Sequence, residues 1–214
     1  MNINELYSLW CEKAVDDPDL KQELISVADD SEGINDRFYR NLEFGTGGLR
    51  GVIGAGTNRM NIYTVRRATQ GFADYINEAF DKPSVAIAYD SRIKSDVFAK
   101  AAAGVFAANG IHVYIYGELM PTPMLSFAVR ELNCQAGVMV TASHNPSKYN
   151  GYKAYGADGC QLNLTDAETV IKKVNALDMF DGVKHIKFDD AVESGMVEYI
   201  GQSVIDKFYE NVLA

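Results

Sequence analysis

The chain has 214 residues, of which 47% are hydrophobic and 23% charged, a balance typical of a folded globular protein. No stretch approaches the roughly 18 consecutive apolar residues that cross a bilayer, so we expect no membrane partner. The formal net charge of −9 argues against a nucleic-acid partner, which would require a basic surface. A phosphate ligand would have to be held by local positive charge, because the overall field repels anions.

The cysteines indicate a reducing compartment. Cys11, Cys134 and Cys160 are widely spaced and form no paired motif, which predicts neither a structural disulfide nor a zinc site. The first residues have neither the basic region nor the apolar core of a signal peptide. A cytoplasmic protein is the simplest interpretation, with Cys134 as a buried packing residue.

Residues 1–40 are predicted to form an N-terminal helical arm. Asn4 and Asp19 could each cap a helix, because apolar residues follow them at helical spacing. The glycine-rich stretch 45–56 interrupts this pattern. The next helix is expected from Thr64 onward, and Pro83 closes it.

From residue 84 the chain alternates between apolar runs and helical patterns. The expected strands are 84–89, 111–116 and 136–140, and the expected helices are 95–108, capped by Ser95, and 122–132. Two successive βαβ units predict that the three strands lie side by side in a parallel arrangement. The predicted fold class is therefore α/β, a three-layer α/β/α domain with a mainly parallel mixed sheet and the helical arm.

The remaining elements are shorter. Residues 152–155 and 160–162 flank Gly156-Ala-Asp-Gly159, which predicts a hairpin. Thr165 is expected to cap a helix that ends at Asn175. Residues 177–195 are expected to be irregular and acidic, followed by a strand at 196–199 and a last helix at 202–213.

Residues 141–153 carry the chemistry of the chain. They read Thr-Ala-Ser-His-Asn-Pro-Ser-Lys-Tyr-Asn-Gly-Tyr-Lys and follow a buried strand, where open α/β sheets place reactive groups. Ser143 offers a hydroxyl, His144 an imidazole, Asn145 an amide and Lys153 an ammonium group. A hydroxyl nucleophile needs such a proton acceptor and such charge-stabilising neighbours. The alternative is a polar turn in which Ser143 and Asn145 only bond the backbone.

These residues resemble a known family. Thr141-Ala-Ser-His-Asn-Pro146 is similar to the active-site serine loop of the α-D-phosphohexomutases, the family of phosphoglucomutases and phosphomannomutases. Asn150-Gly-Tyr-Lys153 resembles the family's Asn-Gly-aromatic-Lys segment. Glu43-Phe-Gly-Thr-Gly-Gly-Leu-Arg-Gly51 resembles its N-terminal glycine loop. The arm and Thr57-Asn-Arg-Met-Asn61 look like the longer subfamily close to phosphoglucomutase-2.

The resemblance implies roles for the serine loop. Ser143 would carry a phosphoryl group, and Mg²⁺ would bind partly through that phosphate. His144 could be a general acid/base, since its unperturbed pKa is about 6.5, or could only position a phosphate. Lys153 is the better candidate for handling the proton, although an ordinary solvated lysine would fit its pattern equally well. Asn145 is expected to bind substrate.

The resemblance also implies a phosphate site upstream. Thr46, Gly48 and Arg50 lie in the glycine loop, where small residues admit a ligand and an arginine offers fork-like contacts. The loop lacks the Gly-Lys-Ser/Thr ending of a nucleotide-binding loop, so nucleotide binding is not implied. The family often has Ser where Gly47 stands. Arg92, after Asp90, is expected near the substrate phosphate or in a structural ion pair with Asp90.

The resemblance extends to domain organisation. Residues 41–200 would be the catalytic-serine domain, domain I, and residues 201–214 a helix leading toward a domain II. The family's metal, sugar-selecting and second phosphate loops do not occur in the sequence, so we expect the N-terminal domain of a longer enzyme, inactive alone, whose partners are the remaining domains. Mg²⁺ would then bind mostly through residues outside the chain.

The implied activity is that of an intramolecular phosphotransferase. It would interconvert hexose 1-phosphate and hexose 6-phosphate, of glucose or mannose, through a phosphoserine and a 1,6-bisphosphate, with glucose 1,6-bisphosphate as activator. A pentose phosphate is a possible second substrate. Two alternatives stay open: a serine-nucleophile sugar phosphatase, and a non-catalytic phosphosugar-binding module.

Overall fold

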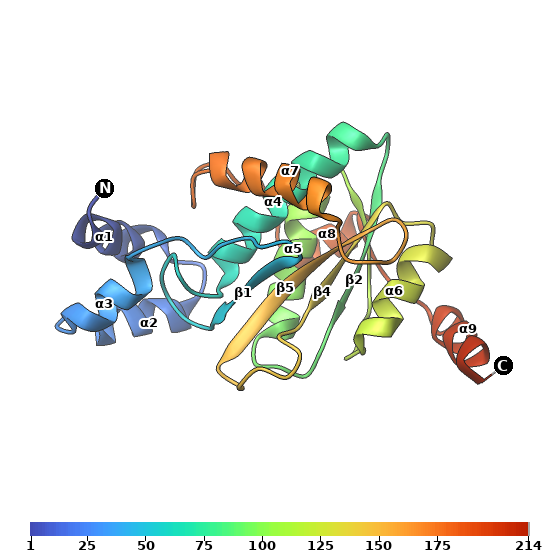
Figure 1. The fold of residues 1–214 in the computed structure, drawn as a ribbon, viewed down its shortest axis with the longest axis horizontal. Helices are drawn as coiled ribbons and strands as arrows, with labels where there is room; N and C mark the ends of the chain where they lie inside the picture. The colour runs from blue at the N-terminus through green and yellow to red at the C-terminus, as the bar shows by residue number, and fades with distance from the viewer. Residues whose placement is uncertain (214) are drawn as a thin grey trace.

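Residues 1–213, the part of the chain that this computed structural model describes, place a six-stranded mixed sheet between two layers of helices (Figure 1). The strands are β1 (Gly48–Val52), β2 (Ser84–Tyr89), β3 (His112–Ile115), β4 (Ala136–Val140), β5 (Tyr149–Gly156) and β6 (Val197–Tyr199). Their order across the sheet is β1-β5-β4-β2-β3-β6. Within these residues β5 alone runs against the others, because it pairs antiparallel with both β1 and β4.

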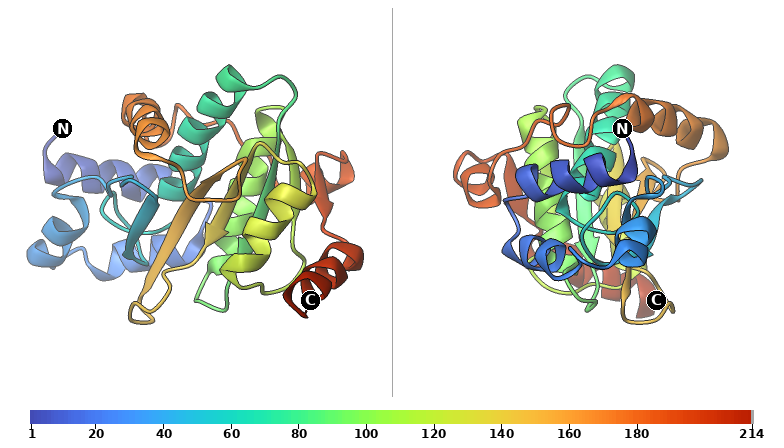
Figure 2. Two further views of the ribbon diagram at one scale, coloured as in Figure 1. Left: turned by 45° about the vertical axis from the view of Figure 1, so that its right-hand side comes forward. Right: turned by 90° about the vertical axis from the view of Figure 1, so that its left-hand side faces the viewer.

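The helices cover both faces of the sheet. They are α1 (Ile3–Lys13), α2 (Pro18–Ser26), α3 (Ser31–Phe38), α4 (Ile62–Ala79), α5 (Ser95–Ala108), α6 (Thr122–Glu131), α7 (Leu164–Ala176), α8 (Phe188–Glu193) and α9 (Gln202–Leu213). One layer holds α4 and α5, with α7 and α8 outside them, and the other holds α6 with α9 (Figure 2). The three-layer α/β/α prediction is confirmed.

The central strands explain this layering. β2 and β4 are almost wholly apolar and buried along their length. Strands with two apolar faces are stable only when helices cover both faces of the sheet. The predicted neighbours β4, β2 and β3 do lie side by side and parallel.

The N-terminal arm joins the same core at one end of the molecule, opposite α9 (Figure 1). Trp10 is fully buried, and its ring meets Phe38, Tyr63 and Phe180 edge to face at 5.3–5.8 Å between centroids. Such aromatic pairs stabilise by about 0.5–1.5 kcal/mol beyond the area that they bury. The arm is therefore anchored on α4 and on the segment after α7.

Several predicted caps were wrong. The observed N-caps of α1, α2 and α7 are Asn2, Asp17 and Asn163, and the expected residues were Asn4, Asp19 and Thr165. Each observed cap accepts a hydrogen bond from a backbone N–H of the first turn, which satisfies a donor that the helix leaves free. Ser95 is also not a cap. It is the first residue of α5, after Lys94 in a left-handed conformation, and its hydroxyl donates to Asp90.

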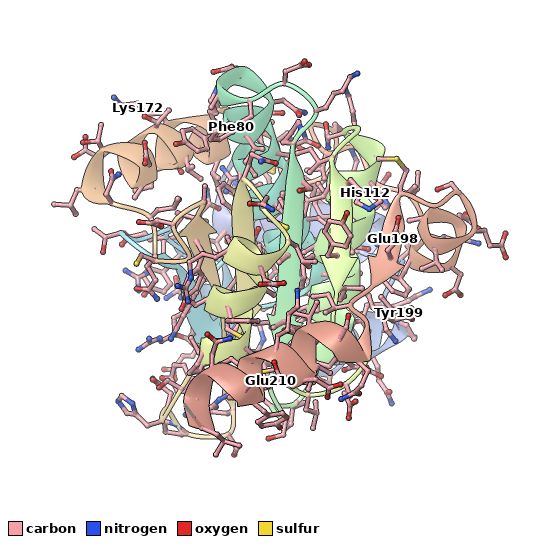
Figure 3. All side chains as sticks on the ribbon, turned by 90° about the vertical axis from the view of Figure 1, so that its right-hand side faces the viewer. Phe80, His112, Lys172, Glu198, Tyr199 and Glu210 are labelled. Atoms are coloured by element: carbon pink, nitrogen blue, oxygen red, sulfur yellow. The ribbon has the colours of Figure 1, made fainter. Side chains whose placement is uncertain are left out.

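The edges of the sheet differ most from the prediction. The glycine-rich stretch contains strand β1, and the acidic stretch 177–195 contains α8. The expected hairpin at Gly156–Gly159 is a turn whose far arm makes only a single bridge, Tyr155 with Gln161. β6 extends the sheet beyond β3, where His112 Nε2 lies 3.2 Å from Glu198 Oε1 (Figure 3). No helix in the described residues is long and apolar enough to span a membrane.

Candidate active site

The serine loop, defined here as Thr141–Lys148, connects β4 with β5 at the lower edge of the sheet in Figure 1. Ser143 is exposed and has a φ of 55°, in the left-handed region. For a residue with a side chain, the left-handed conformation is about 1–2 kcal/mol higher in free energy than the right-handed one. Ser143 Oγ lies 3.4 Å from His144 Nδ1, so the imidazole is within reach of the hydroxyl proton.

Arg92 holds this loop in place from the turn after β2. Its Nη1 atom donates to the carbonyl oxygens of Pro146 and Tyr149, at 3.2 and 3.0 Å. Its Nη2 atom donates to those of Ser143 and Asn145, at 2.5 and 2.6 Å. The guanidinium group is thus aimed at the backbone of the serine loop, which differs from the phosphate contact that the resemblance implies. Nε lies 3.7 Å from Asp90 Oδ2, so the expected ion pair is a secondary contact.

Arg50 and Lys153 share the open face of β1 and β5. Leu49 and Tyr152 pair across these strands and are buried in the core beside α4. Side chains alternate along a strand, so Arg50 and Lys153 lie on the opposite face. α6 covers this face over β4 but leaves it open beyond β5.

An open cavity of about 410 Å³ occupies this face. Its lining is Gly45, Thr46, Gly47, Gly48, Leu49, Arg50, Thr141, Lys153 and Gln161. Gly48 has a φ of 129°, and a Cβ there would lie 1.8 Å from the carbonyl oxygen of Tyr152. Only glycine permits this close approach of β1 to β5.

The cavity is electropositive. The pKa of Lys153 is lowered from its ordinary value, first because burial disfavours the charged amine and second because Arg50 adds a like charge, while Asp90 opposes the shift. A lysine with a lowered pKa can both attract an anion and exchange a proton.

The structure brings together some of the expected site residues but not all. Thr46, Gly48, Arg50 and Lys153 line the cavity, whereas Ser143 and His144 lie outside its lining. Arg50 connects the two groups, because its Nη1 atom donates to Asn145 Oδ1 at 3.2 Å. The site therefore consists of a cationic cavity and an exposed serine loop beside it.

Sequence reasoning missed two lining residues. Thr141, the first residue of the serine loop, lines the cavity on the side of that loop, and its place directly after a buried strand was the available signal. Gln161 reaches the cavity from the turn after β5, and its side chain lies 3.2 Å from where a Cβ of Gly47 would be. No local pattern points to Gln161, because only the folding of the turn brings it to Gly47.

The described residues do not build a Mg²⁺ site by themselves. They contain no group of three or more His, Cys, Asp or Glu side chains close enough to hold a metal ion. Asp90 is a carboxylate close to the serine loop, and its oxygens already accept hydrogen bonds from Thr141, Ser95 and the Arg92 backbone. Mg²⁺ requires an octahedral oxygen shell, so a phosphate on Ser143 would have to be joined by ligands from elsewhere.

Comparison with known proteins connects this geometry to a family. Residues 41–180 match the family described as phosphoglucomutase/phosphomannomutase, alpha/beta/alpha domain I. A phosphoglucomutase of Staphylococcus saprophyticus is 39% identical over 171 residues, which cover 80% of this chain and 31% of that protein. A phosphoglucomutase of Staphylococcus aureus strain USA300 is 43% identical over 165 residues, which cover 77% of this chain and 29% of that protein.

A solved structure shows the same fold. The protein from Thermus thermophilus, which carries a provisional assignment as a phosphomannomutase, superposes with a TM-score of 0.61 at 32% identity. The match covers 69% of this chain and 32% of that one. The chain thus spans about a third of the length of the relatives that it matches.

Proposed function

Because the chain belongs to the phosphoglucomutase/phosphomannomutase family, as its domain I, we propose that Ser143 is the phosphoryl carrier of a phosphohexomutase. The observation that carries this proposal is the exposed, left-handed Ser143 in a loop fixed by Arg92, next to a cationic cavity. A nucleophile needs such access and such fixed geometry.

The transfer step uses residues of both the cationic cavity and the serine loop. The bond between phosphorus and Ser143 Oγ breaks as a sugar hydroxyl oxygen forms its own bond to phosphorus. The hydroxyl proton passes to the amine of Lys153, whose pKa is lowered by burial and by Arg50, or to His144. Ser143 Oγ takes up a proton as it leaves phosphorus, with His144 Nδ1 at 3.4 Å as the donor. Arg50, Thr46 and Gly48 hold the phosphate that is not transferred, with Asn145 as a further substrate contact. Positioning and charge neutralisation provide most of the rate acceleration in phosphoryl transfer.

The full reaction that we propose converts hexose 1-phosphate to hexose 6-phosphate, of glucose or mannose, through a 1,6-bisphosphate that turns over and rephosphorylates Ser143. A pentose phosphate is a second candidate substrate. Glucose 1,6-bisphosphate would act as the activator, and Mg²⁺ would bind through the phosphate and ligands beyond this chain. The cavity is open on one side, so we propose that remaining domains complete it and that this chain alone does not turn over. The three free thiols favour a cytoplasmic location.

One observation favours a second function for the isolated chain. Ser143 does not line the cavity, so a phosphosugar could bind at Arg50 and Lys153 without meeting the hydroxyl. In that case the chain would bind phosphosugars without becoming modified.

The test is the intact mass of the purified chain before and after incubation with glucose 1,6-bisphosphate, with peptide mapping of residues 141–153. A gain of one phosphate, about 80 Da, confined to Ser143 supports the phosphoryl carrier. The matched control is Ser143→Ala, which must gain no mass. A chain that binds the bisphosphate but stays unmodified supports the binding module for this chain alone, and the same measurement on the complete enzyme, where Ser143 must gain the phosphate, then decides the carrier.

A further inference from the structure

The backbone of Ser143 is held by the residue two positions before it. The Ser143 N–H donates to Thr141 Oγ1 at 2.9 Å, and Thr141 Oγ1 in turn donates to Asp90 Oδ2 at 2.5 Å. We propose that Thr141, oriented by Asp90, is a positioning residue that keeps Ser143 in its left-handed conformation. Its catalytic consequence rests on the proposed function, whereas its conformational consequence does not.

The direction of these bonds is determined by Asp90. An ionised carboxylate can only accept hydrogen bonds, so the single proton of the Thr141 hydroxyl is committed to Asp90. The lone pairs of that hydroxyl are then left for the Ser143 N–H. Without Asp90 the hydroxyl could rotate and direct its proton elsewhere.

Asp90 is itself fixed by buried groups. Its Oδ1 atom accepts from the Ser95 hydroxyl at 2.9 Å and from the Arg92 N–H at 3.0 Å. Ser95 Oγ accepts from Asn150 Nδ2 at 3.0 Å, and Asn150 Oδ1 accepts from the Gly151 N–H at 2.7 Å. Ser95 and Asn150 are fully buried, so little water competes for these bonds.

This network connects three segments that are distant in the sequence. Asp90 follows β2, Ser95 begins α5, and Asn150 lies on β5 three residues before the cavity residue Lys153. The side chain of Thr141 is only 4% exposed, whereas Ser143, two residues later, is exposed. A rigid buried network thus ends at one exposed reactive hydroxyl. Left-handed residues with a side chain persist only where their surroundings enforce them, which is the role assigned here to Thr141.

The test compares Thr141→Val, which removes the hydroxyl at nearly constant shape, with Thr141→Ser, which keeps it. Thr69→Val is the matched control, because it deletes another buried hydroxyl, which donates to the Val65 carbonyl of its own helix, lies beside the Tyr152 hydroxyl and makes no hydrogen bond to the serine loop. The first readout is independent of activity: the φ of Ser143 in crystal structures of the variants and the exchange rate of its amide hydrogen by NMR.

We expect Thr141→Val to move Ser143 out of the left-handed region and to speed exchange of its amide by about tenfold or more, whereas Thr141→Ser and Thr69→Val do neither. The second readout is the rate at which Ser143 takes phosphate from saturating glucose 1,6-bisphosphate. Thr141→Val should lower that rate on the order of 10- to 100-fold, with a donor affinity within about twofold of wild type, and Thr141→Ser should restore it.

Unchanged φ and unchanged amide exchange in Thr141→Val overturn the proposal. Equal losses in Thr141→Val and Thr69→Val overturn it as well, because they indicate a general loss of stability. If the wild-type chain takes no phosphate, the transfer readout tests only whether the site is complete in this chain, and the conformational readout alone decides the role of Thr141.

Discussion

The serine loop and the glycine strand β1 border the same site, but different forces hold them. The serine loop is fixed by side chains from the turn after β2: Arg92 donates three bonds to the loop and a fourth to Tyr149 at the start of β5, and Asp90 accepts a bond from Thr141. The glycine strand is fixed by its main chain. Its amides pair with β5, and Gly45 and Gly48 exchange hydrogen bonds with each other.

This difference determines which changes each region tolerates. The serine loop loses its geometry when a side chain elsewhere is removed. The glycine strand loses its geometry when a single methyl group is added. Mutations at the two regions should therefore differ in kind as well as in size.

The largest effect is expected for Gly48→Ala. The new Cβ would lie 1.8 Å from the Tyr152 carbonyl oxygen in a backbone conformation that alanine rarely adopts. We expect the free energy of unfolding to fall by about 3 kcal/mol or more, measured by urea denaturation. Gly45→Ala is the matched control and should change it by less than about 0.5 kcal/mol, because its Cβ meets only ordinary contacts at 3.7 Å. Similar losses in both variants would contradict a strand held by steric fit.

Arg92→Met should affect transfer more than stability. Removing the four bonds frees the serine loop, and we expect phosphorylation of Ser143 to slow on the order of 100-fold. The free energy of unfolding should fall by about 1–3 kcal/mol. Arg130→Met, which removes an arginine that bonds only within its own helix, should change neither. A normal transfer rate in Arg92→Met would mean that the loop keeps its shape without side-chain support.

A smaller effect concerns the titration of Lys153. Burial and Arg50 lower its pKa in the folded chain. At pH values between the folded and the unfolded pKa of Lys153, the unfolded chain binds more protons than the folded chain, so the free energy of unfolding rises with pH. Below this window Lys153 is charged in both states, and the cost of burying its charge lowers the free energy of unfolding by its full amount. Arg50→Met removes the like charge and should raise the pKa of Lys153, measured by NMR on ¹³C-methylated lysines. An unchanged or lower pKa would show that Arg50 does not reach Lys153.

The smallest effect is expected where the two regions touch. Arg50 and Asn145 form an exposed contact between them at 3.2 Å. A double-mutant cycle of Arg50→Met and Asn145→Ala should give a coupling energy below about 0.5 kcal/mol in urea denaturation. A coupling above about 1 kcal/mol would mean that the loops form one cooperative unit, which would remove the contrast drawn above.

Sequence patterns predicted the parts of the fold that depend on local periodicity. The apolar runs of β2 and β4 and the amphipathic helices between them have a direct structural meaning, so the βαβ order was correct. β1 was missed because glycine has low strand propensity and its partner β5 lies far along the chain. α8 was missed because half of its short sequence is acidic and only Ala191 is fully buried, which leaves no apolar periodicity to indicate a helix.

The site residues divide in the same way, into those that a local sequence pattern predicts and those that depend on tertiary contacts. The motif around Ser143 and Lys153 is contiguous and could be predicted, whereas the Asp90–Thr141 bond and the reach of Gln161 depend on tertiary contacts. Arg92 was predicted near the site from the resemblance of Asp90-Ser-Arg92 to the family's Asp-x-Arg segment after a strand. Its direction toward the loop carbonyls could not be predicted, because one arginine can satisfy a phosphate or a backbone equally well.

The pairing of β1 with β5 has a consequence for synthesis on the ribosome. β1 is an edge strand whose only ladder partner in the described residues emerges about 100 residues later, so the pairing is strongly non-local and slow to form. Until Tyr149–Gly156 has left the exit tunnel, Leu49 lacks the partner strand that buries it. The nascent chain must hold an unpaired glycine-rich segment while about 100 further residues are translated, and chaperones can bind the segment in that interval.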